Sequence, residues 1–166
     1  MVDLEGRPPV LTVRPRSGDD LGLQLSTANG GIITPSDLHF ERHHAGVPQI
    51  DPAAHRLLIH GMVARPTIFT LADLQRFPSE SRIHFLECSG NLGRTAGPQT
   101  TPGQLAGLTS TSEWTGVPLA TLFREVGADP EATWFLAEGS DAAVMTRSVP
   151  VAKASDDALI AYGQNG

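Results

Sequence analysis

Cysteine is almost absent from this 166-residue chain, which contains a single one, Cys88. One cysteine cannot form a disulfide within the chain, so cysteine usage gives no sign of an oxidising compartment. Long apolar runs are missing too, because no window approaches the roughly 18 apolar residues that predict a transmembrane helix. The first 15 residues contain neither an apolar signal core nor a twin arginine, so no export signal is visible. The sequence therefore predicts no membrane partner.

Basic residues are also few. The chain has 12 Lys and Arg against 18 Asp and Glu, a net charge of −6. A sequence-independent nucleic-acid binder would need a basic face, so nucleic acid is not an expected partner. A hydrophobic content of 40% with 18% charged residues is ordinary for a globular protein of one domain, or of one domain with a partial second.

Glycine and proline, by contrast, are abundant, with 17 and 13 residues respectively. Together they make up about 18% of the chain against roughly 12% on average, which favours a loop-rich fold over a helical bundle. The apolar runs are short and predict strands, and residues 89–113 are predicted to be one long loop rich in Gly, Thr, Ser and Pro. The predicted strands lie at residues 57–63, 82–88, 134–137, 143–149 and 158–162.

Four short helical segments are predicted, and some carry recognisable end signals. Thr70 is a predicted N-cap with Asp73 three residues later, and Pro78 ends that helix. The amphipathic segment 119–126 is predicted to end at Gly127. A further helical turn is expected at 151–157, and a short helix start at 34–37.

Cys88 stands where the predicted strand 82–88 ends and Ser89-Gly90-Asn91 begins. One interpretation is a buried small apolar residue at a strand end. Another is a thiolate stabilised by the free backbone N–H groups of residues 89–91. Such a thiolate could act as a nucleophile with a histidine base, or as a ligand for a soft metal.

The segment 40–44 (FERHH) offers a different chemistry. His43 and His44 would point to opposite sides of a strand, and there is no second cysteine, so a zinc site is poorly supported. In an extended segment Arg42 and His44 would share one face and form an anion clamp suited to phosphate, sulfite or sulfate. The alternative is a surface basic cluster that offsets Glu41.

Four stretches, in order, resemble the sulfite oxidase family of molybdenum enzymes. Residues 40–44 resemble its F-x-R-N/H-H segment, and 85–91 (FLECSGN) its C-[AS]-G-N cofactor motif. Residues 114–119 (WTGVPL) are similar to its W-x-G-V-P-L segment, and 137–141 (AEGSD) to its E-G-x-D segment. The resemblance runs from about Ile32 to the end and is closest to the SoxC-type sulfite/sulfane dehydrogenases. It implies an α+β fold with a mixed, mainly antiparallel sheet and packed helices.

The resemblance also implies roles for individual residues. Cys88 would give its thiolate to a molybdenum held by the pterin dithiolene (the molybdenum–molybdopterin cofactor), and Arg42 and His44 would lie beside the substrate oxyanion. Asn91 would orient the loop, and Asp141 would contact the pterin. The full expected cofactor-binding set is Phe40, Arg42, His43, His44, Cys88, Ser89, Asn91 and Asp141.

The implied reaction is oxo transfer to a sulfur substrate, either a small anion such as sulfite or a sulfane carried by a sulfur-carrier protein. Electrons would then leave one at a time to a cytochrome c-type acceptor. Full-length relatives are expected to be periplasmic homodimers. A cysteine-dependent hydrolase is a third reading of the same residues.

Some parts of the family pattern differ or are missing. The family's loop arginine, five residues after the cysteine, is Gly93 here, and Arg94 follows it. The downstream G-[YF]-P-[VL]-R segment and the immunoglobulin-like dimerisation domain are absent, and the chain stops at the hairpin signal Asn165-Gly166. We therefore expect an extended arm at 1–31 and a partial molybdopterin-binding domain at 32–166, truncated at its C-terminus. The alternative function is a truncated, catalytically silent fragment of such an enzyme.

Overall fold

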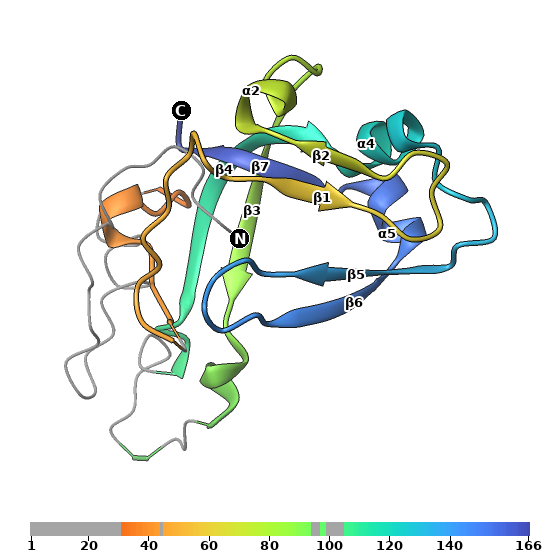
Figure 1. Cartoon of the computed structure of the whole chain (residues 1–166). Helices are drawn as coiled ribbons and strands as arrows, with labels where there is room; N and C mark the ends of the chain where they lie inside the picture. Colours follow the sequence, from red (N-terminus) through yellow and green to blue (C-terminus); the bar gives the residue numbers. More distant parts are fainter. Residues whose placement is uncertain (1–30, 44, 94–96, 99–104) are drawn as a thin grey trace. The chain divides into compact units, whose positions relative to one another are not determined.

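The computed structural model describes residues 31–43, 45–93, 97–98 and 105–166 (Figure 1). The extended arm expected at 1–31 lies outside these residues except for Gly31. The chain forms two compact units. Unit 1 comprises described residues within 45–81 and 115–163, and unit 2 comprises those within 31–43, 82–114 and 164–166.

Helices and strands are short throughout. Unit 1 contains β1 (Leu57–Ile59), β2 (Thr67–Phe69), α2 (Leu71–Leu74), α4 (Leu119–Val126), β5 (Trp134–Glu138), β6 (Thr146–Pro150) and α5 (Val151–Asp156). Unit 2 contains the 3-10 helices η1 (Ser36–Leu38) and η2 (Ser89–Gly93). Three strands contribute residues to both units: β3 (Glu80–Glu87), β4 (Thr109–Pro118) and β7 (Leu159–Gln164). None of the helices in the described ranges is long and apolar enough to cross a membrane.

The strands form three sheets, in the orders β1-β2, β3-β4-β7 and β5-β6. Both two-stranded sheets are antiparallel, in agreement with the mainly antiparallel sheet that the family resemblance implied. In the first, Leu57 is opposite Phe69 and faces the core, whereas Leu58 is opposite Ile68 on the outer face. These two outer side chains are 52% and 59% exposed. The strand predicted at 57–63 is wrong beyond Ile59, and β2 was not predicted because three residues are too short for a periodic signal.

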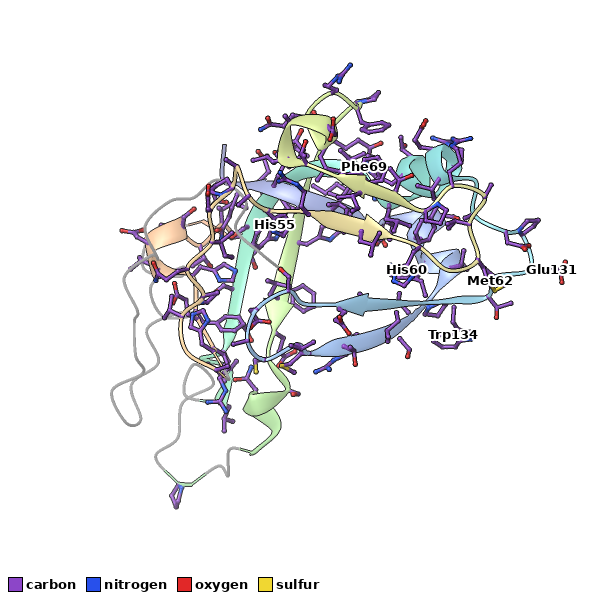
Figure 2. The ribbon with its side chains drawn as sticks, viewed as in Figure 1. His55, His60, Met62, Phe69, Glu131 and Trp134 are labelled. Carbon is purple, nitrogen blue, oxygen red and sulfur yellow. The ribbon has the colours of Figure 1, made fainter. Side chains whose placement is uncertain are left out.

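The core of unit 1 is built around α4. Its buried residues Leu119, Leu122 and Val126 recur at the spacing that places side chains on one helical face. Gly127 closes the helix in the left-handed conformation, with φ of 66°, as its position in the sequence predicted. The buried cluster consists of Phe69, Leu74, Val117, Leu119, Leu122, Val126 and Ala154. Figure 2 shows Phe69 in place on β2, and Trp134 and Met62, which are largely exposed.

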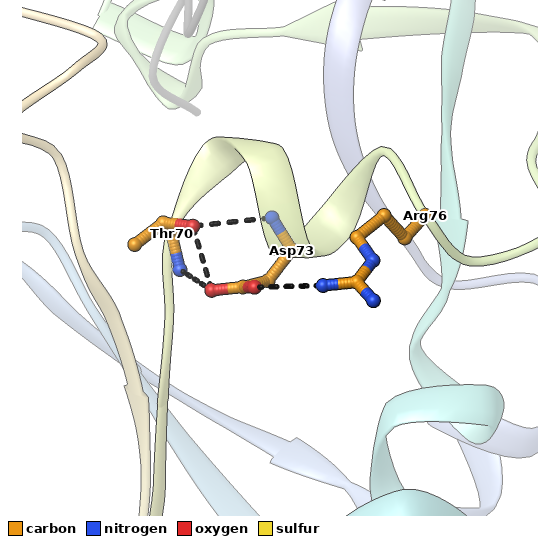
Figure 3. A network of polar contacts seen from close by, with 3 residues as sticks. All are labelled: Thr70, Asp73 and Arg76. Atoms are coloured by element: carbon orange, nitrogen blue, oxygen red, sulfur yellow. Dashed lines mark hydrogen bonds and ion pairs between the residues drawn. The ribbon is translucent and has the colours of Figure 1, made fainter.

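The predicted capping box of α2 is present (Figure 3). The Thr70 hydroxyl accepts the Asp73 N–H at 3.1 Å, and the Asp73 carboxylate accepts the Thr70 N–H at 3.0 Å. The hydrogen bond from the Thr70 side chain, with that from its backbone, lowers the pKa of Asp73. Arg76 lies 4.0 Å from the same carboxylate and adds a weaker attraction.

The prediction of one loop over 89–113 is wrong at both ends, because the 3-10 helix η2 occupies Ser89–Gly93 and β4 begins at Thr109. This part of β4 reads as a loop because it is made of Thr and Ser. Ser110 and Ser112 are nevertheless buried, at 3% and 0% exposure, and each hydroxyl accepts a hydrogen bond. The donors are the Phe40 N–H to Ser110 and the Gln164 amide to Ser112. Hydrogen bonds from segments distant in sequence thus allow small polar residues to occupy buried strand positions.

The expected turn residue Asn165 has φ of 59° and uses its side chain within unit 2. Its amide donates to the Thr34 carbonyl and the Ser36 hydroxyl, both at 3.0 Å. Its side-chain oxygen accepts the Glu113 N–H at 3.0 Å. The residue that follows β7 is thereby joined to Ser36 of η1 and to Glu113 of β4.

Candidate functional site

Cys88 is the first residue after β3, as the sequence predicted, and its side chain is half-buried. Its N–H donates to the Leu108 carbonyl at 2.9 Å, and its carbonyl accepts the Asn91 N–H at 3.0 Å. Its sulfur accepts the Gly90 N–H at 3.3 Å. This backbone donor fixes the direction of the sulfur, and a cysteine sulfur is a ligand suited to soft metals.

Asn91 closes the turn that contains Cys88. Only 9% of Asn91 is exposed, and its side chain contacts three other residues. Its amide donates to the Glu87 carboxylate at 3.2 Å and to the Thr109 hydroxyl at 3.1 Å. Its oxygen accepts the Leu108 N–H at 3.1 Å. The turn therefore has fixed partners on both sides of the cysteine.

The segment that carries Phe40 is attached to β4 in the same unit. The Phe40 N–H donates to the Ser110 hydroxyl at 3.1 Å. The ring of His39 stacks on Phe40, with centroids 5.3 Å apart, and meets Trp114 edge-on at 5.7 Å. His39 Nδ1 contacts the Phe40 carbonyl at 3.0 Å, which assigns the proton to Nδ1 and leaves Nε2 as an acceptor. Within the described part of the chain, the buried Nε2 has no hydrogen-bond partner. Burial lowers the pKa of His39, and the Phe40 carbonyl and the Glu41 charge oppose this effect only in part.

Arg42 is exposed. Among the residues that the structure describes, its guanidinium has no hydrogen-bond or ion-pair partner. Glu41 instead pairs with His43, whose Nε2 lies 2.9 Å from the carboxylate. The alternative interpretation, in which a basic residue balances the charge of Glu41, therefore applies to His43 rather than to Arg42. His44 lies outside the described residues, so a shared face with Arg42 stays a prediction.

The donors available to a metal are few. Across residues 31–43, 45–93, 97–98 and 105–166, no group of three or more His, Cys, Asp or Glu side chains is arranged to hold a metal ion. A structural zinc site needs about four protein ligands, so the geometry gives it no support. A single thiolate is sufficient, however, for a metal whose other ligands come from an organic cofactor. Cys88 fits that requirement, because its sulfur is partly accessible and held by Gly90.

Asp141 belongs to unit 1, where it lies in the turn between β5 and β6. Its carbonyl accepts the Val144 N–H at 3.0 Å, and Val144 has an unusual φ of 45°. A Cβ at Gly139 would lie 3.0 Å from the Asp141 carboxylate, which is the end of a side chain that can move. Asp141 lines a cavity of about 440 Å³, a volume within the usual range for small-molecule sites. The other lining residues, all in unit 1, are residues 45–51, 54, 55, 140 and 142, and Figure 2 labels His55.

The predicted site residues thus fall into three groups. Six of them belong to unit 2: Phe40, Arg42, His43, Cys88, Ser89 and Asn91. Asp141 lies beside a cavity of unit 1. His44 and the loop residue Arg94 lie outside the described residues. The partners of Asn91, namely Glu87 and Thr109, were not singled out from sequence, because nothing in their local pattern distinguishes them.

Comparison with known proteins matches residues 44–166 to the family described as "oxidoreductase molybdopterin binding domain". The chain is 32% identical over 150 residues to sulfite oxidase from Gallus gallus, with 81% of the chain aligned to 32% of that protein. It is 31% identical over 157 residues to NADH nitrate reductase from Ulva prolifera, with 82% of the chain aligned to 18% of that protein. The chain therefore spans about a third or less of the length of these relatives.

A comparison with solved structures agrees with the family match. The crystal structure of the sulfane dehydrogenase SoxCD from Paracoccus pantotrophus matches with a TM-score of 0.74 and 39% identity. The match covers 82% of this chain and 36% of that one. It confirms the predicted α+β fold and the resemblance to SoxC, and the family confirms the expected type of cofactor, molybdenum–molybdopterin. The chain belongs to the oxidoreductase molybdopterin binding domain family.

Proposed function

We propose that this chain is the molybdopterin-binding part of an oxidoreductase that oxidises an anionic sulfur compound. The observation that carries the proposal is the position of Cys88, a lone, half-buried cysteine whose sulfur accepts the Gly90 N–H directly after β3. In a chain of this family, such a thiolate is suited to a metal whose remaining ligands come from the cofactor. The extended arm at 1–31 and the partial domain at 32–166 stay part of the proposal.

When bound, the cofactor supplies oxo transfer and two-electron redox chemistry. Cys88 would hold the metal, and Phe40 and His43 would lie along the cofactor. Asp141, with the cavity beside it, would contact the pterin. Ser89 begins the turn and is exposed. Arg42 would bind and orient the oxyanion through its exposed guanidinium, together with His44.

The substrate class follows from charge and from the relatives. A protein with net charge −6 needs a local positive group to attract an anion, and Arg42 is such a group. Sulfite oxidase and nitrate reductases match this chain at similar identity, so the support for a sulfur substrate comes from the sulfane dehydrogenase, at 39% identity. Sulfite, or a sulfane on a carrier protein, is therefore the proposed substrate. A cytochrome c-type protein is the proposed acceptor, in a periplasmic homodimer.

The second candidate function is a catalytically silent fragment of such an enzyme, with little or no cofactor binding. The chain aligns with 36% of the sulfane dehydrogenase chain that it matches.

The test compares oxidation of sulfite and reduction of nitrate by the purified chain, expressed in a host that makes the cofactor. We expect sulfite-dependent reduction of cytochrome c and no nitrate reduction. Arg42→Ala should raise KM for sulfite by about 10- to 100-fold, the factor for one hydrogen bond to a charged group. Arg65→Ala removes an exposed arginine of unit 1 that pairs with Glu125, and should leave KM unchanged. An unchanged KM in Arg42→Ala would count against the clamp, and a loaded but inactive wild type would favour the silent alternative.

A further inference from the structure

The side chain of Asn91 has no donor left for a ligand. An asparagine amide carries two N–H donors, and here one meets the Glu87 carboxylate at 3.2 Å and the other the Thr109 hydroxyl at 3.1 Å. The side-chain oxygen already accepts the Leu108 N–H. These partners, with a side chain that is almost completely buried, account for all the donors of Asn91.

These contacts surround the cysteine. Glu87 precedes Cys88, Thr109 is the first residue of β4, and Leu108 comes directly before it. The backbone of Asn91 donates to the Cys88 carbonyl, and the backbone of Cys88 donates to the Leu108 carbonyl. Asn91 therefore connects both ends of the turn to β4, and the same turn aims the Gly90 N–H at the sulfur.

We infer that Asn91, acting with Glu87, is a positioning residue for Cys88 and makes no direct contact with the cofactor. The family resemblance implied that Asn91 orients the loop and also placed it in the cofactor-binding set. The hydrogen bonds specify the first role and leave no side-chain donor for the second. It rests on the proposed function in one respect, namely that Cys88 is the residue that holds the metal.

An exchange of the two side chains separates positioning from direct contact. Asn91→Asp places a carboxylate against that of Glu87, so the bond is lost and the two charges repel. The double variant Asn91→Asp/Glu87→Gln restores one amide–carboxylate hydrogen bond with the donor now at 87. Its aspartate can still accept the Leu108 N–H, and the Thr109 hydroxyl can rotate to donate to it. A cofactor contact made through the amide of Asn91 would be absent in both variants.

The first readout is the reactivity of Cys88, which iodoacetamide reports without ambiguity because the chain has no other cysteine. The alkylation rate of the folded chain is divided by that of the chain unfolded in guanidinium. We expect a wild-type ratio well below one, because the folded turn half-buries the sulfur and directs it at the Gly90 N–H. Asn91→Asp should bring the ratio close to one, and the double variant should restore it.

Asn165→Asp is the matched control. The amide of Asn165 also has two acceptors and its oxygen one donor, but none of these partners belongs to the Cys88 turn. Its variant should keep the wild-type ratio. A wild-type ratio of one, an unchanged ratio in Asn91→Asp, or no recovery in the double variant would each overturn the positioning role.

The second readout is the molybdenum content of the purified full chain, expressed in a host that makes the cofactor. We expect less metal in Asn91→Asp and recovery in the double variant. A double variant with normal alkylation but no metal would overturn the inference, because the amide itself would then contact the cofactor. If Asn91→Asp does not fold, comparison of the double variant with the wild type still decides between the two roles. If the wild type carries no molybdenum, the proposed function fails, and the alkylation ratios alone decide the positioning role.

Discussion

The backbone N–H of Gly90 points at the sulfur of Cys88 from 3.3 Å away. Gly90 also fits closely, because a Cβ at this position would lie 3.0 Å from a Leu108 methyl group and 3.4 Å from the sulfur. The geometry of the turn thus depends on a residue without a side chain. Because the methyl group of Leu108 can move, a side chain at Gly90 should disturb this turn without disturbing the rest of the fold.

Gly90→Ala should therefore disturb the thiol more than it disturbs folding. We expect a loss of about 1 kcal/mol in the free energy of unfolding, at the low end for an extra methyl group in a packed site. Urea unfolding measures this loss, and iodoacetamide alkylation of Cys88 measures the change at the sulfur. An alkylation rate equal to that of the wild type would show that Gly90 does not hold the sulfur.

His39 predicts a pH dependence of stability. Its pKa in the folded chain is lowered by burial, so the unfolded chain binds more protons between the two pKa values. The contribution of the neutral ring to stability is then complete above the unfolded pKa of about 6.5 and is lost as pH falls through the lower folded pKa. Urea midpoints at pH 5 and pH 7.5 should differ less in His39→Phe, which keeps an aromatic ring beside Phe40 and Trp114, than in the wild type.

The control for His39 is His60→Gln, which removes an exposed imidazole from unit 1. It should retain the wild-type difference between the two pH values. A His39→Phe variant with the full wild-type difference would assign the pH dependence to other groups.

Local signals in the sequence predicted several elements correctly, because their causes are local. The capping box of Thr70 and Asp73, and the glycine that ends α4, depend on residues within a few positions. The first half of β4 depends instead on partners of Ser110 and Ser112 that lie 70 and 52 residues away. No local pattern contains that information.

In the candidate site, too, some features have local causes and others depend on residues distant in the sequence. Cys88 could be placed at a strand end because alternation and the following Ser-Gly-Asn turn are both local signals. The hydrogen bonds from Asn91 to Leu108 and Thr109 bridge 17 and 18 residues, so the sequence could not show them. For that reason the sequence could single out Cys88 as a candidate ligand but could not show the residues that hold its turn.

Leu122 is completely buried at the centre of α4, so we expect its truncation to cause the largest loss of stability among these variants. Leu122→Ala should lower the free energy of unfolding by about 2–5 kcal/mol, because a cavity remains where the side chain was. Leu58→Ala removes the same atoms from a side chain that is 52% exposed, so it should cost much less. Equal losses in urea unfolding would contradict the assignment of the core.

Gly116 lies where β4 passes close to β7. A Cβ at this position would meet the Ile160 carbonyl and would lie 2.6 Å from the Cα of Ala161, both of which are backbone atoms that cannot yield cheaply. Gly116→Ala should cost about 1–3 kcal/mol through overpacking. Among the described residues, a Cβ at Gly31 would meet only the Ile33 nitrogen, at 4.0 Å, so Gly31→Ala should be nearly neutral in the same urea titration.

The central claim is that Cys88 holds the metal of a molybdopterin cofactor. The most direct test measures molybdenum per chain, by mass spectrometry, in the wild type and in Cys88→Ser after expression in a host that makes the cofactor. Circular dichroism serves to confirm that both chains are folded. The account predicts stoichiometric molybdenum in the wild type and almost none in Cys88→Ser. Equal molybdenum in the two chains, or none in the wild type, would contradict it.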